Sequence, residues 1–251
     1  MMDITSWRLS GCAILFIACM ASVMPVRASD QIKYVYTTAE PLLEVAVGKS
    51  CYPNSFDSLL KEVARLAERK IEIRRLPWKR AQVEARNADN AGIFPITRNA
   101  RREDLYAWIA PLFPFRIAYL TLGSNEPIGS LEEAREKTIA IKAGSSSEFV
   151  ARKHGLPEKN VVVVSSQATI LKMLKAGRVD GWLVWDLIAY KATHEHAPEE
   201  ELHFGYSEEL GDLYFAASRN LSVREAEVWR QAFLRAQDMQ LVERYLACLR
   251  Q

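Results

Sequence analysis

The feature that most constrains the fold of this chain is the regular alternation of short β-rich runs with segments of helical spacing. Residues 71–76 predict a strand, Pro77 then begins a helix at its first turn, and residues 91–94 predict the next strand. Repeated strand–helix units place helices against a mostly parallel sheet, so we predict an α/β fold. The elements expected in this first half are strands at 32–36, 71–76 and 91–94 and helices at 56–69 and 78–86.

Two extended segments interrupt the alternation and predict crossings between two lobes. Residues 111–122 form the first crossing, and residues 213–217 form the return. We therefore expect lobe 1 at residues 29–114, lobe 2 at 115–210, and a return to lobe 1 at 211–251 that contains one long amphipathic helical segment at 223–249. In lobe 2 we expect strands at 138–142, 161–164 (buried) and 179–184, helices at 148–154, 167–176 and 186–191, and a solvated loop at 194–201.

The composition excludes several classes of protein. With 49% apolar and 25% charged residues, the chain has the proportions of an ordinary globular protein and not of a disordered or fibrous one. A net charge of +2 excludes the strongly basic surface that is typical of nucleic-acid binding. The cysteines and histidines are not spaced as metal ligands, and no Gly-x-Ser-x-Gly or His-Glu-x-x-His motif, phosphate loop or dinucleotide fingerprint is present. We therefore expect no metal, no cofactor and no nucleic-acid partner.

The first 28 residues have the features of a cleavable signal peptide. Arg8 precedes an apolar core at residues 9–24, and Val26-Arg27-Ala28 offers a cleavage site, so the mature chain would begin at Ser29 in the periplasm. The alternative is a membrane anchor, but the apolar core has about 16 residues where roughly 20 span a bilayer. Because Phe stands where a lipoprotein box usually has Leu, three residues before Cys19, no lipid anchor is expected. No other apolar run approaches membrane length, so we expect a mature form that does not span the membrane.

The cysteines predict one disulfide. Cleavage would remove Cys12 and Cys19 and leave Cys51 and Cys248 as a pair in a compartment that permits disulfides. Such a bridge would link the C-terminal helix to lobe 1. Closing a loop of this length is worth on the order of 4 to 5 kcal/mol in the chain-entropy model.

Four segments carry a resemblance to a known family. They are Phe56-Asp57 with the helix that follows, Leu76-Pro77-Trp78-Lys79-Arg80, Phe94-Pro95-Ile96-Thr97-Arg98 with its continuation to Pro111, and Ala176-Gly177-Arg178-Val179-Asp180. Over almost all of the mature chain, the sequence resembles the family 3 extracellular solute-binding proteins, the polar amino acid receptors of ABC importers. The resemblance implies a two-lobe type II periplasmic binding fold with two hinge crossovers and, as the family default, a monomer.

The resemblance also implies an arginine that grips the carboxylate of the ligand. In the family this arginine lies six residues before an aromatic residue, and counting back from Trp108 gives Arg102 rather than Arg101. A planar guanidinium pairs with both oxygens of a carboxylate, which a lysine cannot do. Thr97 is the matching hydroxyl donor, and backbone groups near Pro95, which has no N–H, complete that side. The alternative is an exposed basic run that pairs with nearby acidic residues.

From lobe 2 the resemblance implies a Gly-Ser turn at a helix start that holds the same carboxylate. Gly144, Ser145 and Ser146 occupy that position, and a simple N-cap is the alternative role for this turn. In the family, an acidic residue beyond the Gly-Arg-x-Asp segment neutralises the ammonium group of the ligand. Asp186 is the candidate, but it lies six residues after Asp180 instead of the usual five, a spacing that would select Trp185.

The segment after the first strand departs from the family, which commonly has an aromatic residue there that stacks on the ligand. Glu40 lies in this segment and either reaches the cleft, where it would favour a cationic group, or is an ordinary surface carboxylate. Trp78 is a candidate for the missing aromatic wall, with helix packing as its alternative role. Trp182 and Trp185 lie on one predicted strand, and we expect one to face the cleft and the other the core.

Three functions are compatible with these residues. The first is a non-catalytic binding protein that closes on a small amino-acid-like ligand, a zwitterion or an anion, and docks on an ABC permease. The second is an enzyme resembling the periplasmic cyclohexadienyl dehydratases, with Glu40, Asp186 or His154 as acid–base groups. The third is a binding domain that serves a sensor or another partner protein without transport. We favour the first and expect no catalysis.

Overall fold

The computed structural model describes residues 30–39, 53 and 55–249 of the 251-residue chain. Its strands are β1 Tyr34–Thr38, β2 Glu72–Leu76, β3 Ala91–Thr97, β4 Tyr106–Leu122, β5 Ile139–Lys142, β6 Val161–Val164, β7 Gly181–Trp185 and β8 Leu202–Ser218. Its α-helices are α1 Phe56–Leu66, α2 Trp78–Asn87, α3 Leu131–Glu136, α4 Ser147–Lys153, α5 Gln167–Lys175, α6 Asp186–His196, α7 Val223–Asp238 and α8 Leu241–Leu249. Short 3-10 helices lie at Glu103–Leu105 and Glu158–Asn160.

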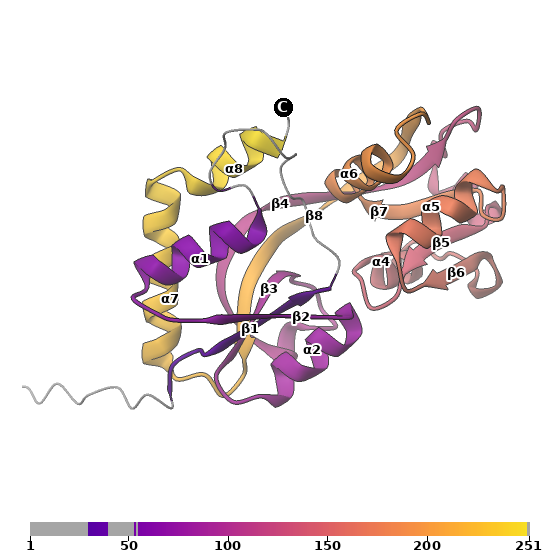
Figure 1. Ribbon diagram of the computed structural model, residues 1–251. Coiled ribbons are helices and arrows are strands. Elements are labelled where there is room, and N and C mark those ends of the chain that lie inside the picture. The colour runs from indigo at the N-terminus through magenta and orange to yellow at the C-terminus, as the bar shows by residue number, and fades with distance from the viewer. Residues whose placement is uncertain (1–29, 40–52, 54, 250–251) are drawn as a thin grey trace, which may run out of the picture.

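The described strands join one eight-stranded mixed sheet in the order β2-β1-β3-β8-β4-β7-β5-β6 (Figure 1). At one end β1 pairs in parallel with β2 and β3, and at the other end β5 pairs in parallel with β6 and β7. Between them, β4 and β8 form a long antiparallel ribbon that runs from Tyr106 opposite Ser218 to Leu122 opposite Leu202. The predicted α/β class is confirmed, with parallel pairing in each half and antiparallel pairing where the chain crosses.

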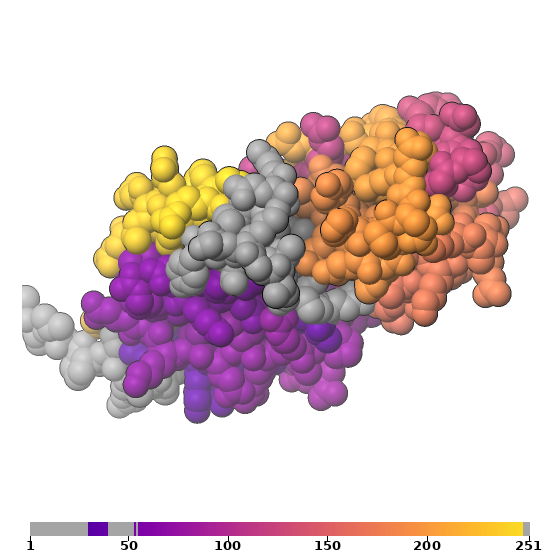
Figure 2. Space-filling model, turned by 45° about the horizontal axis from the view of Figure 1, so that its top comes forward, coloured from indigo at the N-terminus to yellow at the C-terminus, as the bar shows by residue number. Residues whose placement is uncertain are grey.

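The ribbon joins two lobes. Lobe 1 consists of β1 to β3 with α1, α2, α7 and α8, and lobe 2 consists of β5 to β7 with α3 to α6 (Figure 1). The ribbon is shared by the two lobes, since β8 pairs with β3 in lobe 1 and β4 pairs with β7 in lobe 2. Figure 2 shows the purple early part and the yellow end of the chain together in lobe 1, while the orange middle of the chain forms lobe 2.

The core of lobe 1 is aromatic and is built from residues far apart in the chain. Phe215 of β8 stacks on Trp229 of α7 with ring centroids 4.9 Å apart, and it contacts Phe233 at 5.2 Å. Trp229 and Phe233 are an i, i+4 pair, so they lie on one face of α7, and both are buried. The C-terminal helices therefore cover the sheet of lobe 1.

A buried ion pair ties α7 to the early part of the chain. The carboxylate of Glu225, which is 1% exposed, accepts hydrogen bonds from Arg69 Nη2 at 2.8 Å, Trp229 Nε1 at 2.9 Å and the backbone N–H of Ile32 at 3.2 Å. Ser222 caps the same helix by accepting from the backbone N–H of Glu225 at 3.2 Å. A buried carboxylate is tolerated here because each of its oxygens has a donor.

The segment 223–249 is helical as predicted, but it is divided into α7 and α8 at Gln240, which has a φ of 54°. Two other predictions about the later elements are wrong. Strand β8 begins at Leu202 and not at 213, and residues 194–196 belong to α6 and not to a loop. The early part of β8 is polar, so its hydrophobic pattern does not reveal the strand.

The environment predicted for residues 161–164 is also wrong. This run of four valines forms β6, which is the edge strand of lobe 2, and Val163 is 54% exposed. An unbroken apolar run is typical of a buried parallel strand. It has no alternation of polar and apolar residues, however, that would distinguish an edge from an interior position.

Several predictions fall outside the described residues. These are the signal peptide at 1–28, Glu40 and Cys51, and the side chain of Cys248 is also outside the described part, so the disulfide stays a prediction. In the part of the chain that the structure describes, no helix combines the length and the apolar character that a membrane crossing requires.

Candidate functional site

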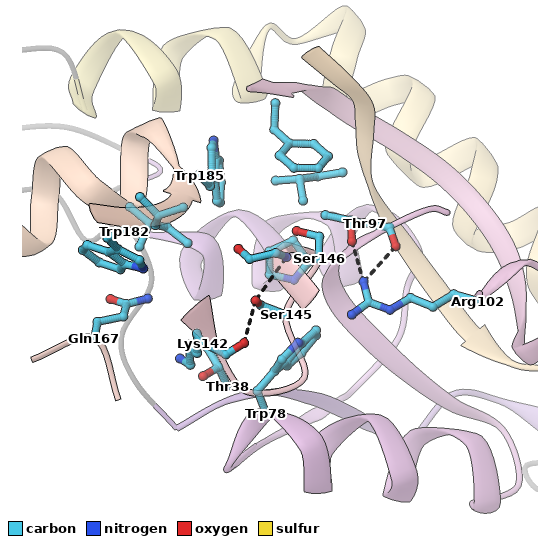
Figure 3. A pocket seen from close by; sticks show the side chains of 16 residues that line it. Thr38, Trp78, Thr97, Arg102, Lys142, Ser145, Ser146, Gln167, Trp182 and Trp185 are labelled. Carbon is cyan, nitrogen blue, oxygen red and sulfur yellow. Dashed lines mark hydrogen bonds between the residues drawn. The ribbon is translucent and has the colours of Figure 1, made fainter. Parts of the chain in front are cut away.

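A cavity lies between the lobes, where strands from both lobes end (Figure 3). Thr38 ends β1 and Thr97 ends β3 in lobe 1, while Lys142 ends β5 and Trp185 ends β7 in lobe 2, and all four residues line the cavity. Ligands of open α/β sheets bind at the carboxyl ends of strands. The space is about 100 Å³, several times the roughly 10–15 Å³ that one water needs, so it suits a small molecule.

Arg102 joins the two lobes at one side of this cavity. It follows β3 and is 7% exposed. Its Nη1 donates to the backbone oxygen of Thr97 at 3.1 Å and to the Thr97 hydroxyl, and its Nη2 donates across the cleft to the backbone oxygen of Gly144 at 3.0 Å. Two residues singled out in the sequence, Arg102 and Thr97, therefore lie side by side (Figure 3), and Arg102 also contacts the Gly-Ser turn of the other lobe.

The Arg102 guanidinium is a buried cation. Burial lowers its pKa to about 10; Tyr106 and Glu148 oppose this shift, and the neighbouring cations Arg101 and Arg86 add to it. Arg102 nevertheless stays charged at neutral pH. Among the described residues, no carboxylate bonds to it, since its hydrogen bonds go to Thr97 and Gly144. A cation in this condition gains free energy from an anion that reaches it.

The structure separates Arg102 from the other basic residues of its segment. Arg98 is exposed, pairs with Glu103 (Nη2 to Oε1 2.5 Å), and lies over the ring of Trp108. This pairing raises the pKa of Arg98 and lowers that of Glu103. Arg101 is also exposed. The surface role considered for the whole basic run therefore describes Arg98, while Arg102 turns inward to the cavity.

The Gly-Ser turn of lobe 2 lies opposite Arg102. Ser145 donates its hydroxyl to the backbone oxygen of Lys142 at 2.7 Å, and Ser145 Oγ accepts from the backbone N–H of Ser147 at 3.2 Å. Ser146 is the residue before α4, yet its side chain makes no capping hydrogen bond. Both Ser145 and Ser146 line the cavity.

Direct contacts hold the lobes together around this turn. The backbone oxygen of Gly144 accepts from Gln82 Nε2 at 3.0 Å as well as from Arg102, and Lys79 Nζ lies 3.8 Å from Glu148 Oε1. Gly144 has a φ of +73°, and a Cβ placed on it would lie 2.6 Å from Cγ of Lys79. The close approach of the two lobes therefore depends on a glycine at this position.

Three tryptophans line the cavity: Trp78, Trp182 and Trp185 (Figure 3). The expectation that Trp182 and Trp185 divide between cleft and core is wrong, because both line the cavity and both are buried. Trp185 is the last residue of β7, where the chain turns into α6, so the alternation of a regular strand no longer applies. Trp185 also packs against Phe113 and Phe115.

The remaining candidates differ in their positions. Pro95 and Trp78 line the cavity together with Arg102, Thr97, Ser145 and Ser146, whereas Asp186 is not among the described residues that line it. The Asp186 carboxylate accepts from the backbone N–H of Leu187 at 2.7 Å, in the first turn of α6. Sequence reasoning did not single out Thr38, Lys142 and Gln167, which also line the cavity. Each of them ends a strand or begins the helix after one, and the carboxyl-end rule could have identified them.

A basic groove adjoins the cavity and shares Arg102 and Ser145 with it. The groove has about 340 Å³ of space, and its charged lining consists of Lys79, Arg86, Arg101, Arg102 and Glu148. Glu148 accepts from the backbone N–H of Gly144 at 2.6 Å and lies near Lys79. The approach to Arg102 is therefore positively charged. In the described residues, no cluster of three or more His, Cys, Asp or Glu side chains could hold a metal ion.

Solved structures of other proteins match this architecture, whereas no protein-family model and no curated protein matches the chain. A histidine kinase sensor domain with similarity to periplasmic binding proteins has a TM-score of 0.75 and 14% identity, over 88% of this chain and 96% of that one. An amino acid ABC transporter substrate-binding protein from Streptococcus pneumoniae, bound to L-arginine, has a TM-score of 0.73 and 15% identity, with the same shares covered.

The chain has the two-lobe fold of periplasmic binding proteins. A third structure, of an ancestral amino acid-binding protein described as a precursor of cyclohexadienyl dehydratase, matches with a TM-score of 0.69 and 17% identity over 85% of this chain and 92% of that one. The TM-scores show the fold alone, and because the identities are low, function is argued from the cleft.

Proposed function

We propose that this chain is a non-catalytic binding protein that captures a small carboxylate-bearing, amino-acid-like ligand between its lobes. The observation that carries the proposal is the Arg102 guanidinium, which is 7% exposed, cationic, and bonded to no described carboxylate. Its planar fork of donors matches the two oxygens of a carboxylate.

The position of Arg102 gives this binding protein its closing mechanism. A carboxylate at Arg102 meets the Thr97 hydroxyl from lobe 1 and the Ser146 hydroxyl from lobe 2, because these residues line one cavity. Ser145 also lines the cavity, and its hydroxyl donates to the backbone oxygen of Lys142. Since both lobes donate to the same anion, the ligand binds the closed arrangement better than an open one. The ligand therefore shifts the population of lobes toward closure.

The proposed location is the periplasm, and the proposed partner is an ABC permease. The signal-like residues 1–28 support the location. The structural similarity to amino acid ABC transporter substrate-binding proteins supports the partner. The match to a histidine kinase sensor domain favours a second candidate, in which closure around the ligand is read by a sensor. Measuring uptake of the ligand by cells that lack the permease distinguishes these two partners. Loss of uptake supports the permease, and unchanged uptake supports the sensor.

Absence of catalysis is part of the proposal. The charged side chains among the described residues that line the cavity are Arg102 and Lys142, both suited to holding an anion. Mass spectrometry of the ligand after prolonged incubation with the protein tests this point. An unchanged ligand supports binding alone, and a dehydrated or otherwise altered product contradicts it.

The test of the binding function uses residues 29–251, refolded free of carried ligand, in a thermal-shift screen against amino acids, opines, polyamines and small dicarboxylates. A ligand at 100 times its dissociation constant adds roughly 2.7 kcal/mol to the free energy of unfolding. With the best ligand, Arg102→Ala should lose about 2 to 5 kcal/mol of binding free energy. The matched control is Arg80→Ala, which removes an exposed arginine that lines neither the cavity nor the groove and should leave affinity within about twofold. Equal affinities of the two variants remove Arg102 from the site.

A further inference from the structure

The cavity contains a buried hydrogen-bond donor that the protein does not satisfy. Trp182 is 1% exposed, lines the cavity, and its Nε1 has no hydrogen-bond partner in the part of the chain that the structure describes. It lies on β7, an interior strand, opposite Leu120 of β4 and Ala140 of β5. A buried N–H without an acceptor costs free energy, so this position favours a ligand that brings an acceptor.

A second cation lies on the same side of the cavity as this donor. Ala140 is opposite Trp182 in the sheet, and Lys142 is two residues further along β5, so its side chain projects from the same face. Gln167, the first residue of α5, lines the cavity there too. Figure 3 shows Trp182 and Gln167 at one side of the cavity and Arg102 with Thr97 at the other. The cavity thus has a cationic group toward each side.

Among the described residues, the side chains that line the cleft carry mostly positive charge. The described residues that line the cavity include Arg102 and Lys142 and no carboxylate, and the adjoining groove adds Lys79, Arg86 and Arg101 against Glu148 alone. The net charge of the chain is only +2, so this basic character is a local concentration. A cationic end of a ligand would meet like charge at Lys142.

We infer that the ligand is a small molecule with a carboxylate at each end, one bound by Arg102 and Thr97 and the other by Trp182 and Lys142. This inference rests on the binding function proposed above and specifies its substrate class. The first carboxylate supplies the counter-ion that the buried guanidinium lacks, and the second supplies the acceptor that the indole N–H lacks. A dicarboxylic acid and an acidic amino acid share this chemistry.

Calorimetric titration of the refolded protein, residues 29–251, tests the inference with matched probes. Succinate is compared with butyrate, which has the same length and one carboxylate, and L-glutamate is compared with L-glutamine and L-arginine. We expect the probe with two carboxylates to bind about tenfold or more tightly than its single-carboxylate partner. The stronger of succinate and glutamate identifies the source of the dianion. If butyrate, glutamine or arginine binds as tightly as its dianionic counterpart, the inference is wrong while the binding function stands.

A variant then locates the second carboxylate. Trp182→Phe removes the N–H and keeps an aromatic ring. It should lower the affinity for the dianion about tenfold and change the affinity for butyrate by less than twofold. Trp185→Phe, on the same strand and in the same cavity, is the matched control. It should leave the ratio of the affinities for succinate and butyrate unchanged. Equal losses for succinate and butyrate in Trp182→Phe overturn the role of the indole. If no probe binds and Arg102→Ala changes nothing in the wider screen, it is the proposed function that fails.

Discussion

At the scale of single residues, Gly144 occupies the most demanding position in the cleft. Its carbonyl accepts from Arg102 and Gln82 of the other lobe, its N–H donates to Glu148, and its φ of +73° disfavours any residue with a Cβ. Gly144 therefore has to adopt a positive φ and has to leave room for the other lobe to approach closely.

The substitution Gly144→Ala should reduce both stability and ligand affinity. The left-handed backbone costs an alanine about 1 kcal/mol or more, and the new Cβ would lie 2.6 Å from Cγ of Lys79, which pushes the lobes apart. Urea unfolding measures the first effect and calorimetry with the best ligand measures the second.

Gly177 provides the control for this substitution. It also has a positive φ, +61°, but no atom lies within 4 Å of a Cβ built there. Gly177→Ala should therefore destabilise by a similar backbone cost and leave affinity unchanged. If both variants bind equally well, closure does not require contact at Gly144.

The sequence predicts a site residue when a local motif determines its position, and fails when its position depends on the order of strands in the sheet. Thr97 ends a strand and Arg102, Ser145 and Ser146 follow strands, all within sequence motifs that resemble those of a known family. All four line one cavity, and their role in binding stays a prediction. Trp182, Lys142 and Gln167 carry no such motif, because their position depends on which strand lies next to which in the sheet. Asp186 and Trp185 are alternatives because they lie six and five residues after Asp180. Of the two, only Trp185 lines the cavity.

At the scale of elements, the buried pair between Arg69 and Glu225 holds α7 against the beginning of lobe 1. The side chains are 12% and 1% exposed, and the donors to Glu225 come from three residues, Arg69, Trp229 and Ile32. The charge of Arg69 is thus compensated by one carboxylate that the sequence places 156 positions away.

The substitution Glu225→Gln should destabilise the protein by about 3 kcal/mol, because it leaves the partly buried Arg69 charge without a counter-ion. Chemical denaturation followed by tryptophan fluorescence gives the value. Glu227→Gln is the control on the same helix, since Glu227 pairs with Arg230 at the surface and its loss should cost less than about 1 kcal/mol. Comparable losses in the two variants contradict a structural role for the buried pair.

Elements were predictable where local pattern and burial agree. The apolar face of α1, from Phe56 to Val63, is visible as helical spacing and is buried in the core. Prediction failed for elements whose extent or exposure depends on pairing with strands distant in the sequence. Strand β8 continues through a polar stretch because β4 pairs with it, and β6 lies at an edge because β5 has its other side against β7.

At the scale of the whole molecule, charge is distributed so that an almost neutral chain has a basic entrance to its cleft. Arg86 and Arg101 are exposed in the groove beside Arg102 and form no ion pair with the described carboxylates. Such a local field attracts anions over a distance of about one Debye length, roughly 10 Å at 0.1 M salt.

The substitution Arg86→Glu should slow association of an anionic ligand several-fold and leave dissociation nearly unchanged, because a charge at the rim acts on the encounter. Stopped-flow fluorescence of the cavity tryptophans with succinate, at two salt concentrations, measures both rates. Arg80→Glu is the control, since Arg80 lies on the same helix and does not line the groove. A loss that appears in the dissociation rate instead contradicts steering.

The double crossing of the chain has a consequence for the order in which the molecule is made. The segment from Gly123 to Glu201 leaves and re-enters the ribbon at one point, where the N–H of Gly123 donates to the oxygen of Glu201 at 2.9 Å. The helices α3 to α6 and the strands β5 to β7 of lobe 2 are therefore one continuous insertion that is synthesised before β8, and β8 then adds contacts such as that of Glu208 with His154. Lobe 1 needs Phe215, Trp229 and Phe233 to fill its core. The lobe that the ribosome starts first is thus the last to be finished, and the inserted lobe can fold while its host is still being translated.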